Sequence, residues 1–145
     1  MKIAIASDHH GVELKQKLTK YLETMNYNVI DCGPNTSEIV DYPDYAFKVG
    51  NMIVTKVADY GILICNTGIG MSIAANKVRG VRCARVVSKE DAKMTRRDND
   101  ANVIALSAHI DIEKIKEILD IFFNTEFLKL DRYVRRIEEI NNYEC

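Results

Sequence analysis

Short apolar segments alternate with longer segments of helical periodicity along the whole chain. The segment at residues 60–65, YGILIC, is apolar throughout, which is typical of a strand buried on both faces of a sheet. Further strands are predicted at 2–7, 27–33, 81–87 and 101–107, and helices at 12–25, 45–57, 70–78, 88–97, 111–123 and 132–142. Residues 34–44 contain both prolines and are predicted to form a loop.

This alternation predicts an α/β fold. Five strands separated by helices favour a doubly wound parallel sheet of the Rossmann-like or flavodoxin-like kind, with helices on both faces and an additional C-terminal helix. No repeat or low-complexity segment interrupts the pattern, so residues 1–145 are predicted to form a single domain.

The composition argues against two classes of partner. The formal net charge of the 145 residues is −1, so no basic field favours nucleic acid. No apolar run approaches the roughly 20 residues that cross a bilayer, and the start, MKIAIASDHHG, is typical of a first strand and not of a signal peptide. We therefore expect a cytoplasmic protein with neither nucleic-acid nor membrane partners.

The cysteines indicate free thiols. Cys32, Cys65, Cys83 and Cys145 form no CxxC pair, and the three histidines do not have zinc-finger spacing. In a reducing compartment we expect no disulfide and no metal site. Cys32, Cys83 and Cys145 are interpreted as structural or incidental.

In doubly wound sheets, ligands bind beyond the carboxyl ends of the strands. The predicted strand ends are followed by SDHHG (7–11), DCG (31–33), CNTGIG (65–70) and VS (87–88). Residues in these four segments are therefore the candidates for a functional site.

The segment CNTGIG combines a thiol with a glycine-rich turn. Gly68 and Gly70 allow the backbone to approach a ligand closely, and a helix that begins near Gly70 would favour an anion. The same field would favour the thiolate form of Cys65, which is the form that acts as a base or nucleophile. We favour a reactive thiol beside an anion-stabilising loop, and the alternative is a small buried cysteine that closes a strand.

Other candidates have equally plain structural explanations. Asp8 and His9 would bind sugar hydroxyls or a phosphate, or Asp8 would be the N-cap of the first helix. Asn99 stands among charged residues that are also typical of a solvated helix end. Arg132 and Arg136 have the i, i+4 spacing of a phosphate clamp, but the spacing alone favours a surface helix with Arg–Glu pairs.

Together these motifs resemble the ribose-5-phosphate isomerase B family, which includes galactose-6-phosphate isomerase subunits and allose-6-phosphate isomerases. The resemblance is carried by SDHHG (7–11), VIDCG (29–33), DYPDYA (41–46), the block 61–84, NDANVIA (99–105) and DRYVRRI (131–137). It implies an aldose–ketose isomerase of pentose phosphate metabolism, without metal or cofactor. Such enzymes interconvert ribose 5-phosphate and ribulose 5-phosphate through a cis-enediolate.

The resemblance also implies roles for individual residues. Cys65 would be the base that moves a proton between C1 and C2, with Thr67 beside it and the N–H groups of residues 66–70 stabilising the enediolate. The implied substrate contacts are Asp8, His9, Asn66, Gly68, Ile69, Gly70, Asn99, His109, Arg132 and Arg136. In the family the arginine clamp reaches across from the partner subunit, which implies a homodimer with shared sites, or two such dimers paired into a tetramer.

The sequence departs from the family at three of these positions. Asp98 stands where a histidine usually assists ring opening, His109 where many members have an arginine, and Asn66 where glycine is usual. An aspartate of ordinary pKa is ionised at neutral pH, so Asp98 would accept the anomeric proton but not supply one. The acid half of ring opening would then pass to His9, His10 or water.

Two alternative functions remain at this stage. The first is the same chemistry on a hexose 6-phosphate, such as galactose or allose 6-phosphate. The second is a non-catalytic module that binds a sugar phosphate, which explains the glycine loop and the arginines but not the position of Cys65.

Overall fold

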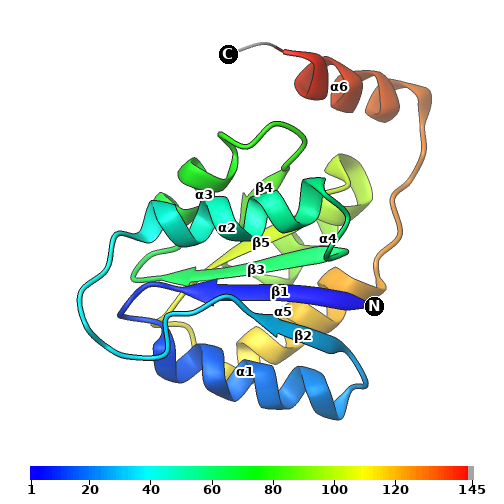
Figure 1. The fold of residues 1–145 in the computed structure, drawn as a ribbon. Coiled ribbons are helices and arrows are strands. Elements are labelled where there is room, and N and C mark those ends of the chain that lie inside the picture. The colour runs from blue at the N-terminus through cyan, green and yellow to red at the C-terminus, as the bar shows by residue number, and fades with distance from the viewer. Residues whose placement is uncertain (144–145) are drawn as a thin grey trace.

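The computed structural model describes residues 1–143 as a five-stranded parallel sheet with six helices (Figure 1). The strands are β1 (Lys2–Ser7), β2 (Asn28–Asp31), β3 (Tyr60–Cys65), β4 (Cys83–Arg85) and β5 (Val103–Ser107). The helices are α1 (Val12–Thr24), α2 (Tyr42–Val54), α3 (Ile69–Ala75), α4 (Lys89–Asn99), α5 (Ile112–Asn124) and α6 (Asp131–Asn142). The predicted fold class is confirmed.

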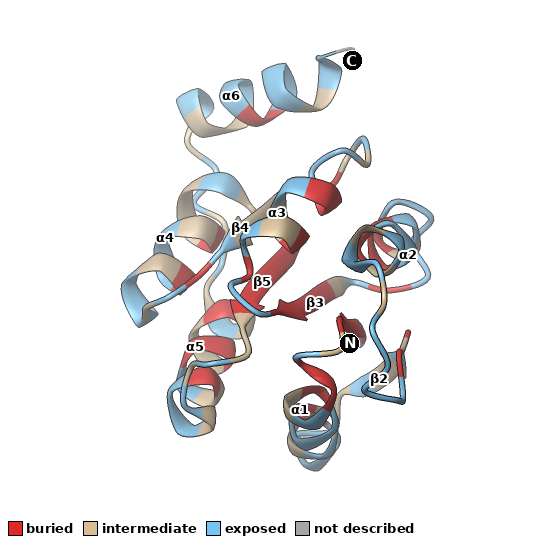
Figure 2. Cartoon of the chain, turned by 90° about the vertical axis from the view of Figure 1, so that its left-hand side faces the viewer, coloured by how far each residue is buried: buried red, intermediate tan, exposed pale blue. Residues whose placement is uncertain are grey.

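The strands lie in the order β2-β1-β3-β5-β4, so β5 separates β3 from β4. The connection through α3 passes over β5 to reach β4, and the connection through α4 returns in the opposite direction. Because crossovers between parallel strands are right-handed, connections that run in opposite directions place their helices on opposite faces. Accordingly, α1, α4 and α5 pack on one face of the sheet, and α2 and α3 on the other (Figure 2).

The two faces of the central strands carry side chains of different size. In β1, Ile3 and Ile5 point toward α1 and α5, whereas Ala4 and Ala6 point toward α2 and α3. All four are completely buried, as are the three residues Ile62 to Ile64 of β3. The prediction that β3 is buried on both faces is confirmed. Burial also extends to the carboxyl ends of β1 and β3, where the predicted site residues follow.

Helix α6 lies apart from the sheet (Figure 1), and Ile137 is its one buried residue. Helix α6 contacts α4, and Asn141 bonds it to the rest of the chain. The Asn141 backbone oxygen accepts a hydrogen bond from Nε of Arg79 (3.2 Å), and its side chain accepts one from Nη1 of Arg82 (3.2 Å). An open groove of about 860 Å³ lies between α6 and residues 76–81. Most of the surface of α6 is therefore uncovered in the single chain.

The bounds predicted for the loop 34–44 and the helix 45–57 are partly wrong. Helix α2 begins at Tyr42, within the predicted loop 34–44, and ends at Val54 instead of residue 57. Pro43 stands in the first turn, where a missing N–H costs nothing, so this proline starts a helix and does not mark a loop. At the other end, Lys56 adopts a φ of +62°, which stops the helix.

Other elements are shorter than predicted. Strand β2 covers only 28–31, β4 only 83–85, and β5 begins at Val103. Strand β4 is an edge strand and pairs with β5 alone over three residues. Helix α3 runs from Ile69 to Ala75 and not to residue 78, because the side chain of Asn76 bonds both the backbone N and O of Cys83 (2.7 and 2.9 Å). The predicted start of α4 is confirmed, with the Ser88 hydroxyl as its N-cap.

Within residues 1–143, no helix has the length and apolar character that a membrane crossing requires. Cys32, Cys65 and Cys83 are free thiols, as expected, and Cys145 lies outside the described residues.

Candidate active site

Cys65 is the last residue of β3, where it is paired with Ser107 of β5 and its backbone oxygen accepts a hydrogen bond from the N–H of Ala108 (2.9 Å). The residue is 5% exposed. Its Sγ accepts a hydrogen bond from the backbone N–H of Gly68 at 3.1 Å. Gly68 has a φ of +77°, a left-handed conformation that turns the chain back toward the sulfur. The loop therefore gives the thiol a backbone donor, which is the arrangement that stabilises negative charge on sulfur.

Gly70 lies in the first turn of α3, against the ring of Tyr42 from α2. A Cβ at residue 70 would lie 2.6 Å from Cζ of Tyr42, closer than real side chains approach. A side chain at this position would displace the Tyr42 ring, so glycine permits the close contact between α2 and α3, in addition to the predicted closeness to a ligand. Next to it, Thr67 uses Oγ1 to accept a hydrogen bond from the N–H of Ile69 (3.1 Å).

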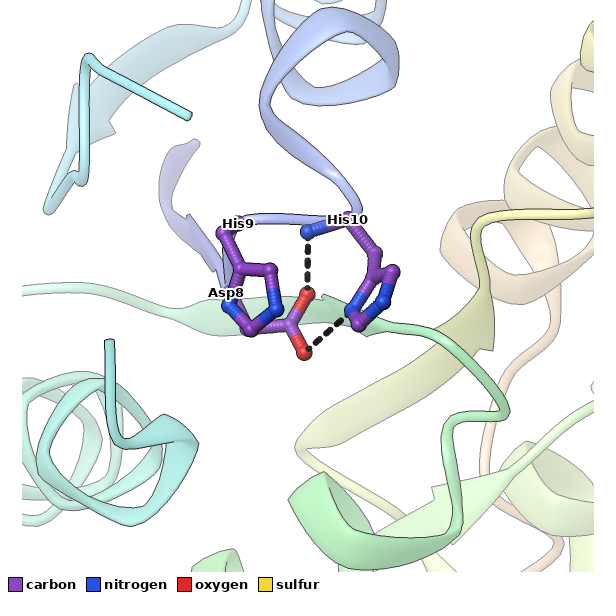
Figure 3. Close-up of side chains that lie close together, drawn as sticks. All are labelled: Asp8, His9 and His10. Atoms are coloured by element: carbon purple, nitrogen blue, oxygen red, sulfur yellow. Dashed lines mark hydrogen bonds and ion pairs between the residues drawn. The ribbon is translucent and has the colours of Figure 1, made fainter. Parts of the chain in front are cut away.

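Asp8, His9 and His10 follow β1, whose carboxyl end lies beside that of β3 (Figure 3). The Asp8 carboxylate accepts a hydrogen bond from the backbone N–H of His10 (2.9 Å) and contacts Nδ1 of His10 at 3.2 Å. His9 accepts a long hydrogen bond from the backbone N–H of Val40 at Nδ1 (3.4 Å). The N-cap of α1 is Gly11, so the alternative that Asp8 caps this helix is wrong.

Within residues 1–143, these same three residues form a group that could hold a metal ion. One donor atom from each lies within 4.8 Å of the other two. The Asp8 carboxylate already has two polar partners, both from His10, and the ring centroids of His9 and His10 are 4.2 Å apart. The cluster is thus held together by its own contacts, with His9 half-buried and His10 exposed.

Asn66 and His109, two of the positions at which the sequence departs from the expected family pattern, contact each other. Nε2 of His109 hydrogen-bonds Oδ1 of Asn66. Ser107, at the end of β5, joins the two residues a second time: its Oγ donates to the Asn66 backbone oxygen (2.7 Å) and accepts from the His109 backbone N–H (3.1 Å). Both side chains are exposed and lie beside the loop that carries Cys65.

Asp98 forms a two-pronged ion pair with its neighbour Arg97. Nε of Arg97 lies 2.6 Å from one carboxylate oxygen and Nη2 lies 3.1 Å from the other. The hydrogen bonds from Arg97 lower the pKa of Asp98 below its ordinary value, and the charge of Arg132 acts in the same direction. Asp98 is therefore ionised at neutral pH, as the sequence predicts.

Asp98, Asn99, Arg132 and Arg136 lie away from Cys65 within one chain. Asp98 and Asn99 form the last turn of α4, before β5 begins, whereas Cys65 is in register with Ser107 at the end of β5. A rise of about 3.3 Å per residue places the two ends of β5 about 13 Å apart. Arg132 and Arg136 belong to α6, and Arg136 lines the groove beside residues 76–81. The predicted site residues thus form two groups. The Cys65 group lies at the carboxyl ends of the strands, and the group of Asp98, Asn99, Arg132 and Arg136 lies toward their amino ends.

Two residues beside the Cys65 loop were not among the predicted site residues. Arg85, the last residue of β4, donates from Nε to the backbone oxygen of Thr67 (2.9 Å), and Ser107 bonds the backbone oxygen of Asn66. Ser107 is the polar last residue of an apolar predicted strand, whereas Arg85 lies inside the predicted strand 81–87, so no strand-end signal points to it. Their partners depend on the strand order, which the sequence does not reveal.

The whole chain was compared with known families and structures. Residues 3–140 match the model of the Ribose/Galactose Isomerase family. The chain belongs to this family. It is 38% identical over 144 residues to ribose-5-phosphate isomerase B of Escherichia coli strain K12, across 99% of this chain and 96% of that protein.

Solved structures agree with this membership. A ribose 5-phosphate isomerase from Thermotoga maritima is 45% identical, covers 98% of both chains and has a TM-score of 0.94. Ribose-5-phosphate isomerase B from Mycoplasma genitalium with bound ribulose-5-phosphate is 42% identical, with a TM-score of 0.93 over 98% of this chain and 95% of that one. The expected family and enzyme class, an aldose–ketose isomerase, are confirmed, whereas the roles of individual residues stay predictions.

Proposed function

We propose that this isomerase interconverts ribose 5-phosphate and ribulose 5-phosphate, with Cys65 as the base. The observation that carries the proposal is the placement of the Cys65 sulfur at the carboxyl edge of the sheet with the Gly68 N–H directed at it. The names of the relatives supply the substrate: each of the three is a ribose 5-phosphate isomerase, and one structure holds ribulose-5-phosphate.

The proposed reaction moves one proton between neighbouring carbons. The Cys65 thiolate takes the proton from C2 of the open-chain aldose, and the electron pair of that C–H bond forms the C1–C2 double bond while O1 becomes negative. The N–H groups of residues 66–70 stabilise this enediolate as an oxyanion hole does. The O2 proton moves to O1, and the Cys65 thiol returns its proton to C1, which leaves the C2 ketone.

Ring opening precedes this step, and we assign Asp98 as its base. The carboxylate accepts the proton of the anomeric hydroxyl, and its lowered pKa keeps it ionised for that purpose. It cannot protonate the departing ring oxygen, so His9, His10 or water supplies that proton. Asn99 is proposed to bind sugar hydroxyls, as its counterparts in the family do.

The active unit is proposed to be a homodimer, or a tetramer built from two dimers. One chain holds the Cys65 group and the arginine group at opposite ends of its strands, while α6 leaves most of its surface and a groove beside it uncovered. In a dimer, Arg132 and Arg136 of one subunit would reach the Cys65 loop of the other and bind the substrate phosphate. Asp98 and Asn99 of that same subunit would complete the site.

The deciding experiment is the conversion of ribose 5-phosphate to ribulose 5-phosphate by the purified protein. Cys65→Ala is the control, because it removes the base with little change in volume. Turnover that depends on Cys65 supports the proposal. Turnover that survives in Cys65→Ala would exclude Cys65 as the base.

A protein without turnover on ribose 5-phosphate would next be tested with galactose and allose 6-phosphates. If none of these is converted but one of them still binds, the protein is a sugar-phosphate-binding module. A cytoplasmic location and a single domain over residues 1–145 stay predictions.

A further inference from the structure

Arg85 lies beside the loop that carries Cys65. It is the last residue of the edge strand β4, in register with Ala105 of β5, and its side chain is exposed. From this position its Nε donates a hydrogen bond to the backbone oxygen of Thr67, 2.9 Å away. No carboxylate of the described residues 1–143 lies within ion-pair distance of Arg85, and the Thr67 carbonyl is the acceptor that its side chain bonds.

The Thr67 carbonyl and the Gly68 N–H belong to one peptide group. In a trans peptide the C=O and N–H bonds point in opposite directions from the same plane. The Gly68 N–H donates to Sγ of Cys65 at 3.1 Å. Arg85 therefore holds one end of the peptide whose other end touches the sulfur.

A cation on the carbonyl strengthens the N–H at the other end. Hydrogen bonds in a chain polarise one another, and a charged donor polarises its acceptor more than a neutral donor does. Cys65 as a whole is 5% exposed, so little water competes for the Gly68 N–H. A more polarised N–H stabilises a negative sulfur more than a neutral one.

A neighbouring contact fixes the preceding peptide in a similar way. The Ser107 hydroxyl donates to the backbone oxygen of Asn66 at 2.7 Å. Two consecutive carbonyls of the loop are thus held by side chains from β5 and β4. The Ser107 contact orients its peptide without adding charge, whereas the Arg85 contact does both.

We propose that Arg85 is a positioning residue for the catalytic thiolate, acting through the Thr67–Gly68 peptide. The inference rests on the proposed function, in which Cys65 is the base. It adds a residue that does not touch the reacting atoms and that sets how readily the sulfur carries negative charge.

The test compares Arg85→Gln, which keeps a hydrogen-bond donor and removes the charge, with Arg85→Lys, which keeps the charge. The first readout is the rate at which iodoacetamide alkylates Cys65 at pH 7, followed on the Cys65 peptide by mass spectrometry. Charge-assisted hydrogen bonds exceed neutral ones enough that Arg85→Gln should slow alkylation by about 5- to 10-fold. Arg85→Lys should stay within about 3-fold of the wild type.

The second readout is steady-state kinetics. A positioning role lowers kcat in Arg85→Gln by a similar 5- to 10-fold, with KM within about twofold of the wild type. Lys20→Gln is the matched control, because it removes an exposed cation from the outer surface of α1, and it should change neither readout. Circular dichroism of each variant confirms folding, and Arg85→Met, which also removes the charge, replaces Arg85→Gln if that variant does not fold.

Two results would overturn the inference. If KM rises and the alkylation rate is unchanged, Arg85 binds the substrate phosphate directly. If neither readout changes, Arg85 has no part in the reaction. Alkylation needs no turnover, so a wild-type protein that fails to convert ribose 5-phosphate would refute the proposed function while this comparison still decides the role of Arg85.

Discussion

Asp98 places a carboxylate where the resemblance to the family implies a histidine. Its pKa is lowered by Arg97, so its carboxylate stays ionised down to acidic pH. An ionised carboxylate can open the ring only as a base. Its contribution should therefore be confined to the cyclic substrate.

Asp98→Asn should lower kcat for ribose 5-phosphate, which is mostly cyclic, by about 100-fold, the lower end of general acid–base effects. The initial rate from ribulose 5-phosphate should change much less, because that sugar has its 5-hydroxyl esterified and forms no ring. Because the pKa of Asp98 is lowered below the ordinary aspartate value, the carboxylate does not titrate near neutrality, and the ratio of wild-type to variant rates should stay constant between pH 5 and pH 8. If the variant lost the same factor in rate with both substrates, Asp98 would not be the base of ring opening.

Asn66 and His109 are expected to act as a pair. Their side chains bond one another, so changing one leaves the other without its partner. Asn66→Gly and His109→Arg together restore the residues usual in the family, and the arginine fork should lower KM for ribose 5-phosphate by about 10-fold. We expect the effects of the two single variants on KM not to add up to that of the double variant. Additive effects would show that the two positions act independently.

At the scale of whole elements, α2 and α3 meet where Tyr42 packs on Gly70. Gly70→Ala should lower the free energy of unfolding by about 1 to 3 kcal/mol, because the new methyl group overlaps the tyrosine ring. In a Tyr42→Ala background the same change should cost less than about 1 kcal/mol, since the ring is gone. Urea unfolding of the four proteins in this cycle measures both costs. Equal costs in the two backgrounds would contradict the close contact.

The bounds of the helices and strands also show which parts of the fold can be predicted from sequence patterns. The apolar run 60–65 predicts β3 at its observed bounds, and Ser88 with Glu90 and Asp91 predicts the start of α4, because these signals are local. The start of α2 was missed because Pro43 is compatible with both a loop and a first helical turn. The early end of α3 depends on the hydrogen bond between Asn76 and Cys83. This contact joins two elements, so the hydrophobic periodicity of the sequence cannot predict it.

The candidate site was predictable to a similar extent. Cys65, Asp8 and His9 follow from strand ends, and their grouping at one edge is correct. The contacts of Arg85 and Ser107 with the Cys65 loop require β5 to lie next to β3 and β4 next to β5. Strand order comes from the packing of the whole sheet, so these two residues could not be assigned from local patterns.

At the scale of the whole molecule, a second chain would bring the two groups of site residues together, as the proposed dimer requires. Cys65→Ala and Arg136→Ala should each be inactive as pure proteins, and mixing them with subunit exchange should restore activity. Half of the dimers in an equal random mixture are mixed and carry one intact site out of two, so about a quarter of wild-type activity should return.

Each pure variant at the same total concentration, taken through the same exchange procedure, is the control for this mixture. Sedimentation should show dimers or tetramers throughout. Mixed assemblies that form and stay inactive would exclude sites shared between subunits.

The strand order has a consequence for how the chain folds during synthesis. Strand β3 and the Cys65 loop are made well before β5, and β4 pairs with β5 alone. Until residues 103–107 leave the ribosome, β4 has no strand to pair with, and the Asn66 carbonyl lacks the Ser107 hydroxyl that later bonds it. Arg85 can reach Thr67 only after β4 has docked on β5. The loop that appears midway along the nascent chain therefore gains its final shape only after more than two thirds of the protein has been made.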